Sequence, residues 1–129
     1  MQATRIVVVS PSRALGTVLE RHLSTSRFEV VDVRPGLGML EAICRDRPGI
    51  AVIDRIDERP EAARMEIAVL KEFWPGVEII AYSLRSTETD ASIVEQGVFY
   101  YAGSASVDEL IRVIYAADQA VALEREHRR

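Results

Sequence analysis

Short apolar runs alternate along the chain with segments whose apolar residues recur at helical spacing. Glycine or proline stands near most of the boundaries between them, where these residues favour turns. The runs predict five strands, at Ile6–Ser10, Phe28–Val33, Ile50–Asp54, Val77–Ser83 and Val98–Gly103. The pattern therefore predicts five units, each made of a strand and the helix that follows it.

The segments between the runs predict amphipathic helices, each with one apolar stripe that faces a core. Cys44 lies on the stripe of the second helical segment, and we therefore expect it in the core. Pro60 suits the first position of the third helix. The stripe expected to bury this helix consists of Met65, Ala68, Val69 and Phe73.

The last two helical segments differ in their apolar content. The segment from Thr87 to about Gly97 has few apolar residues to bury, so we expect a short and weakly held fourth helix. The last segment opens with a capping box of Ser106 and Glu109. Its apolar residues alternate three and four apart, like a heptad seam, at Val107, Leu110, Ile114, Ala117 and Val121. We expect a helix of about residues 106–127 that overhangs the sheet, with fraying after Ala117 as the alternative.

Five nearly continuous apolar strands, each followed by a helix, predict a parallel sheet covered on both faces. The handedness of the crossovers leaves few topologies, and the flavodoxin-like strand order 2-1-3-4-5 is common at this size. We therefore expect a single α/β domain over residues 1–129, a flavodoxin-like (βα)5 three-layer sandwich. Ligands of such sheets bind at the carboxyl ends of the strands, which here bear Ser10, Asp54, Ser83 and Gly103–Ser104.

Composition narrows the class of protein. Apolar residues make up 48% of the chain and charged residues 28%, an ordinary globular balance. The net charge of −4 argues against binding to nucleic acid. Cys44 is the single cysteine, which favours a reducing compartment and excludes an internal disulfide. The apolar run after Arg5 is too short for a secretory signal or a membrane span. We expect a cytoplasmic domain that contacts neither membrane nor nucleic acid.

Four segments together resemble the receiver domain of response regulators, the CheY-like family of bacterial two-component signalling. They are RPGIAVID at the third strand, WPGVEIIAYS at the fourth, EQGVFYYAGS at the fifth and SVDELIRVI at the start of the last helix. The resemblance covers about residues 4–117. It places the family's phosphoacceptor on Asp54, its switch hydroxyl on Ser83 and its switch aromatic on Tyr101.

The sequence departs from the family where the site carries charge. The acidic pair that holds Mg²⁺ falls on Ser10 and Pro11, and the lysine falls on Ser104. Neutral oxygens hold Mg²⁺ poorly, and a neutral hydrogen bond contributes about 0.5–1.5 kcal/mol, against about 1.5–3 for a charged one. Inverting a two-state switch takes about 5.5 kcal/mol. The resemblance therefore implies a degenerate receiver with no cofactor and no catalysis, in which Arg85 is the candidate to replace the lysine.

Two other functions stay open. The chain can be a single-domain response regulator that is phosphorylated on Asp54. It can also be a flavodoxin-like ligand-binding protein, since SPSRALGT is faintly similar to the hydroxyl-rich phosphate loop of flavodoxins. No G-x-G-x-x-G follows the first strand, and no Ser-His-Asp or Cys-His set is present, so we expect no enzyme. We also expect no DNA-binding domain, because no residues remain for one after the last helix.

The resemblance further implies that the protein acts by binding a signalling partner. Receiver domains commonly pair through the fourth helix, the fifth strand and the fifth helix, so a homodimer through this face is expected. Alternation along Phe99, Tyr100 and Tyr101 should turn at least one ring toward a partner. The expected interaction surface is Tyr101, Val107, Leu110, Ile114 and Val121.

Overall fold

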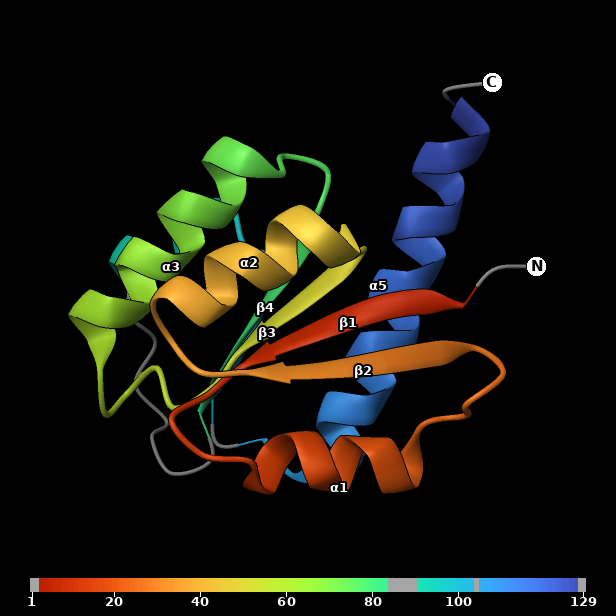
Figure 1. Ribbon diagram of the computed structural model, residues 1–129, viewed down its shortest axis with the longest axis horizontal. Helices are drawn as coiled ribbons and strands as arrows, with labels where there is room; N and C mark the ends of the chain where they lie inside the picture. Colours follow the sequence, from red (N-terminus) through yellow and green to blue (C-terminus); the bar gives the residue numbers. More distant parts are fainter. Residues whose placement is uncertain (1–2, 84–90, 104, 128–129) are drawn as a thin grey trace.

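The computed structural model describes residues 3–83, 91–103 and 105–127. Five strands alternate with five helices along the chain (Figure 1). In chain order they are β1 (Thr4–Val9), α1 (Ala14–His22), β2 (Phe28–Val33), α2 (Leu37–Asp46), β3 (Ile50–Ile53), α3 (Pro60–Phe73), β4 (Glu78–Ser83), α4 (Ala91–Val94), β5 (Tyr100–Gly103) and α5 (Val107–His127). The prediction of five strand–helix units is confirmed.

The strands form one parallel sheet in the order β2-β1-β3-β4-β5. This is the predicted flavodoxin-like order, and it is confirmed. Val9 lies beside Val33 on one side and Ile53 on the other, and Ile53 lies beside Ala81. This register brings the carboxyl ends of β1, β3 and β4 to the same edge of the sheet.

Helices cover both faces of the sheet, as Figure 1 shows with α2 and α3 on one face and α1 and α5 on the other. Alternate residues of β1 serve the two layers, because successive side chains of a strand point to opposite faces. Ile6 and Val8 pack in the core beneath α1 and α5, whereas Val7 and Val9 pack in the core beneath α2 and α3. All four side chains are fully buried.

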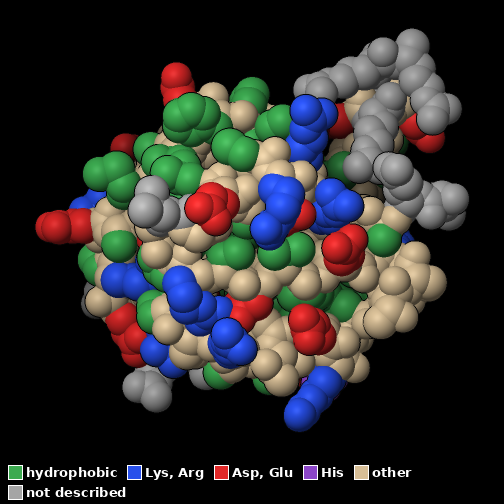
Figure 2. All heavy atoms as spheres, viewed as in Figure 1, with side chains coloured by type: hydrophobic (Ala, Val, Ile, Leu, Met, Phe, Trp, Pro, Cys, Tyr) green, Lys and Arg blue, Asp and Glu red, His purple; other side chains and the backbone are tan. Residues whose placement is uncertain are grey.

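The apolar stripe predicted to bury α3 is wrong. Met65 is 67% exposed and Phe73 is 61% exposed. The helix instead buries Ala63, Glu66, Ile67 and Leu70. Helix α3 carries apolar residues at helical spacing on two faces, and the charged Glu66 obscures the one that faces the sheet. Figure 2 shows hydrophobic side chains gathered on the surface over α2 and α3.

Cys44 is exposed, so its predicted place in the core is also wrong. Helix α2 buries Met39, Ala42 and Ile43. Cys44 follows Ile43 by one residue, which turns it about 100° around the helix axis and away from the sheet. The position of Cys44 next to the buried Ile43 in the sequence therefore did not predict that Cys44 is buried.

The long last helix is confirmed, and it continues to His127. Leu110, Ile114 and Ala117 are fully buried against the sheet, and Val121 is 7% exposed. The predicted interaction surface is therefore wrong for Leu110, Ile114 and Val121, which belong to the core of the domain. A seam with three and four spacing faces a sheet as readily as it faces a second helix. Beyond Val121, residues 122–124 and 126 are exposed, and Leu123 is 57% exposed.

Helix α4 is the shortest helix of the described chain and buries Ile93. It is short, as predicted, although the capping residues predicted for it, Thr87 and Asp90, lie outside the described residues. Among the helices that the structure describes, none combines the length and the apolar run that a membrane crossing requires.

Candidate functional site

The polar residues predicted at the strand ends lie next to one another. Ser10 follows β1, Asp54 follows β3 and Ser83 ends β4. Ser10 and Ser83 are fully buried, and Asp54 is 7% exposed. Ser83 pairs with Gly103 at the end of β5. Ser104 and Arg85 lie outside the described residues.

Asp54 is bonded through both oxygens of its carboxylate. Its Oδ2 accepts a hydrogen bond from the Ser10 hydroxyl at 2.7 Å, and its Oδ1 accepts one from the backbone N–H of Arg55 at 2.9 Å. The Ser10 oxygen in turn accepts from the backbone N–H of Ser12 at 3.2 Å. Pro11, the second position of the expected acidic pair, is exposed. Ser10 is therefore the residue after β1 that touches Asp54.

Burial and local hydrogen bonds act on the pKa of Asp54 in opposite directions. Burial raises the pKa of the carboxyl above its ordinary value, and this effect is the largest. The hydrogen bond from Ser10 opposes it most strongly, followed by the backbone N–H of Arg55 and the positive charges of Arg55 and Arg59. The net pKa of Asp54 is raised.

Arg59 fixes the backbone beneath the site, a role that the sequence reading missed. Its Nη2 donates to the carbonyl oxygen of Asp54 at 2.8 Å and to that of Val9 at 3.3 Å. Its Nη1 forms an ion pair with Glu66, whose side chain is 6% exposed. Arg59 thus ties the ends of β1 and β3 to the buried face of α3. The only sequence signal was a charged residue at position 66 within a helical segment.

Tyr82 is a second residue of the site that the sequence reading missed. It is 3% exposed, and its hydroxyl donates to the carbonyl oxygen of Ala105 at 3.0 Å. Burial raises the pKa of the Tyr82 hydroxyl, and the negative charge of Asp54 adds to this effect. Tyr82 therefore links the end of β4 to the residues that open α5.

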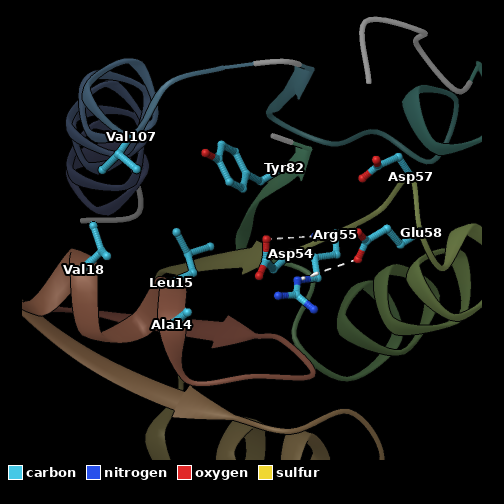
Figure 3. Close-up of a pocket in the computed structure, with 9 residues that line it drawn as sticks. All are labelled: Ala14, Leu15, Val18, Asp54, Arg55, Asp57, Glu58, Tyr82 and Val107. Carbon is cyan, nitrogen blue, oxygen red and sulfur yellow. Dashed lines mark hydrogen bonds and ion pairs between the residues drawn. The ribbon is translucent and has the colours of Figure 1, made fainter. Parts of the chain in front are cut away.

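A pocket with a volume of about 210 Å³ opens beside Asp54 (Figure 3). In Figure 3, Val18 and Val107 lie toward one end of the pocket and Asp57 and Glu58 toward the other, with Asp54 between them. Helices α1 and α5, strand β4 and the loop between β3 and α3 supply its walls. The lining residues are Ala14, Leu15, Val18, Asp54, Arg55, Asp57, Glu58, Tyr82 and Val107. The pocket therefore combines an apolar wall with an acidic end.

The aromatic residues near β5 divide between the core and the surface. Tyr101 is half-buried and packs against the core beneath α2 and α3. Phe99 is 36% exposed and Tyr100 is 42% exposed. At least one of these rings is therefore exposed, as predicted, and its contact with a partner stays a prediction. Val94 of α4 is also exposed, at 43%.

The solved structures most similar to this chain in the comparison are receiver domains. The signal receiver domain of a Luxo repressor protein from Vibrio parahaemolyticus matches with a TM-score of 0.79 at 13% identity, over 96% of each chain. A response regulator from Thermotoga maritima matches with a TM-score of 0.72 at 16% identity, over 92% of this chain and 99% of that one. The beryllofluoride-activated NtrC receiver domain matches with a TM-score of 0.72 at 22% identity, over 93% of this chain and 98% of that one.

No protein-family model matches the sequence, and no curated protein matches it in a sequence search. These three structural matches are below 25% identity, so they establish the fold. The chain has the fold of response-regulator receiver domains along nearly its whole length. Asp54 follows the third strand of that fold, at the position where the resemblance placed the phosphoacceptor.

Proposed function

We propose that this chain is a receiver-like signalling module that works by binding another protein, without Mg²⁺-dependent phosphorylation. The observation that carries the proposal is the hydrogen bond of 2.7 Å from Ser10 to Asp54. Ser10 stands after β1, where the resemblance places the first residue of the family's acidic pair. The residue at this position therefore gives Asp54 a neutral hydrogen-bond donor.

The donors around Asp54 do not fit Mg²⁺, which prefers several oxygens and usually includes one or two carboxylates. Ser10 offers a neutral oxygen that is already bonded to Asp54, and Pro11 has no side-chain donor. Within the described part of the chain, no three His, Cys, Asp or Glu side chains gather closely enough to hold a metal ion. Asp54 is therefore the one carboxylate that the resemblance matches to a metal ligand.

The competing function is that of a single-domain response regulator phosphorylated on Asp54. It is favoured by the position of Asp54, which lines an open pocket at the end of β3. The two functions differ in whether the carboxylate accepts a phosphoryl group from a small donor. The intact mass of the protein after incubation with a phosphodonor therefore distinguishes the two functions.

The test is to incubate the protein with Mg²⁺ and acetyl phosphate and to measure its intact mass. We expect no phosphate adduct, because nothing matched to the family's metal ligands neutralises the incoming phosphoryl group. An active receiver domain treated in parallel is the detection control. A stoichiometric adduct that Asp54→Asn abolishes would establish the phosphorylated regulator instead.

The partner-binding part of the proposal rests on the exposed side chains near β5. Val94 ends α4, Phe99 lies just before β5 and Tyr100 begins it, and all three are more than one third exposed. Aromatic residues of this kind are enriched at protein interfaces. We expect Tyr100→Asp to abolish capture of a partner from the native cell. Met65→Asp on α3 is the control, because Met65 is even more exposed than Tyr100, and it should leave capture intact. Loss of capture with both variants, or with neither, would contradict this surface.

A further inference from the structure

We infer that the pocket beside Asp54 binds a small organic cation, specifically a primary amine carried on a short arm from an aromatic ring. This goes beyond the proposed signalling function, and it does not depend on whether Asp54 accepts phosphate. The inference rests on three properties of the pocket: its apolar wall, its charge and its size.

The apolar wall is built by three separate elements. Leu15 and Val18 come from α1, Tyr82 comes from β4 and Val107 begins α5. Ligand pockets are typically concave, mainly apolar and furnished with a few polar groups that fix orientation. In Figure 3 these apolar side chains converge on the space to one side of Asp54. They form a surface that suits a hydrocarbon or aromatic group.

The opposite end of the pocket carries an excess of negative charge. Asp54, Asp57 and Glu58 contribute three carboxylates, and Arg55 contributes the one guanidinium among the lining residues. Arg55 pairs with Glu58 at 3.7 Å, which partly neutralises that carboxylate. The remaining acids favour a cation and repel an anion. A phosphate or carboxylate ligand would have its charge beside carboxylates.

The size of the pocket limits the hydrocarbon part of the ligand. An apolar cavity of about 150 Å³ holds one benzene ring. The pocket measures about 210 Å³, which leaves room for one ring and a short aminoalkyl arm. The ring would lie against Leu15 and Val18, and the ammonium would face Asp54 and Asp57. One ligand then contacts α1, β4 and the start of α5.

The test is an NMR titration of the ¹⁵N-labelled full chain with phenethylamine as the probe. We expect saturable shifts of backbone amides in α1, in β4 and at the start of α5, with a Kd on the order of 1 mM for so small a ligand. Matched compounds separate the two parts of the site. 2-Phenylethanol lacks the charge, 3-phenylpropionate reverses it and n-butylamine lacks the ring, and each should bind at least tenfold more weakly.

Two variants locate the site on this pocket. Ala14→Leu fills the apolar end from an exposed helix position and should weaken binding at least tenfold. Asp57→Asn removes one exposed charge and should weaken it about two- to fivefold. Asp108→Asn on α5 is the matched control, because Asp108 is exposed and lies outside the pocket, and it should leave the Kd unchanged.

The proposal is overturned by absence of saturable shifts, by equal binding of the alcohol and the amine, or by shifts that map elsewhere. It is also overturned if Ala14→Leu, folded by its own spectrum, binds phenethylamine as well as the parent chain does. None of these outcomes bears on the phosphate-adduct experiment, so the failure of either proposal can be recognised separately.

Discussion

Two opposing effects act on the pKa of the Asp54 carboxyl. Burial favours the protonated form, and hydrogen bonds favour the charged form. Burial is the larger effect, so the pKa in the folded chain is raised above the ordinary value of 3.8. Between that value and the raised pKa, the folded chain binds more protons at this residue than the unfolded chain does. The free energy of unfolding contributed by Asp54 therefore falls as the pH rises through this window.

Asp54→Asn removes this titration and should change the pH dependence of stability. We expect the melting temperature of the variant, relative to the parent chain, to increase as the pH rises from about 3 to 7. Thermal melts followed by circular dichroism at matched ionic strength measure this difference. The altered hydrogen bonds of the variant can shift its melting temperature by a constant amount at every pH, and this shift does not change how the difference from the parent chain varies with pH. A relative melting temperature that falls with rising pH would contradict a raised pKa for Asp54.

Ser10→Ala tests the opposing effect at the same carboxylate. Because the Ser10 hydroxyl donates to Oδ2 and lowers the pKa of Asp54, its loss should move the pKa further upward. A hydrogen bond to a charged group contributes about 1.5–3 kcal/mol, so the variant should also be less stable at neutral pH. The ¹³Cγ shift of Asp54 across a pH titration gives the midpoint. Ser12→Ala is the control, because the Ser12 hydroxyl bonds to the backbone N–H of Ala14 and not to Asp54. If Ser10→Ala leaves the titration midpoint of Asp54 unchanged, the Ser10 hydroxyl does not lower the pKa of Asp54.

The residues of the site could be predicted from the sequence only where they end a strand. Ser10, Asp54 and Ser83 each follow or end an apolar run, and parallel strands bring such positions together. Tyr82 and Arg59 left no comparable signal. Tyr82 lies inside an apolar run, and the contacts of Arg59 with the ends of β1 and β3 exist only in the folded chain.

At the scale of elements, strands were easier to predict than the orientation of helices. The five apolar runs match the five strands to within about two residues at each end, because buried parallel strands need apolar side chains on both faces. A helix needs one apolar stripe, and α3 has two candidate stripes. Ion pairing between Arg59 and Glu66 allows the stripe with a charged member to face the sheet. Periodicity alone could not choose between them.

A pair of substitutions on α3 measures this choice directly. Ile67 is fully buried and Met65 is 67% exposed, although they stand two residues apart. We expect Ile67→Ala to lower the free energy of unfolding by about 2–5 kcal/mol, because it leaves a cavity in the core. Met65→Ala should change it by about 0.5 kcal/mol or less. Urea denaturation measures both; a larger loss for Met65→Ala than for Ile67→Ala would mean that the predicted stripe, and not the observed one, faces the sheet.

For the whole molecule, the surface proposed for a second protein depends on which apolar side chains the fold buries. The sequence predicted an interaction surface along α5, but Leu110 and Ile114 are buried in the core of the domain. The aromatic residues Phe99 and Tyr100, just before and at the start of β5, are exposed. The charged end of α5 beyond Val121 offers one large exposed apolar side chain, Leu123, among the described residues.

These facts lead us to expect a homodimer that depends on the start of β5 and not on the end of α5. In sedimentation at micromolar concentration, Tyr100→Asp should raise the dimer Kd by about 30-fold or more, as for loss of an aromatic anchor worth about 2 kcal/mol. A chain truncated after residue 122 keeps Val121 in the core and should dimerise like the full chain. If truncation dissociates the dimer and Tyr100→Asp does not, the overhanging end of α5 is the interface. If the full chain is monomeric, the prediction of a dimer is wrong.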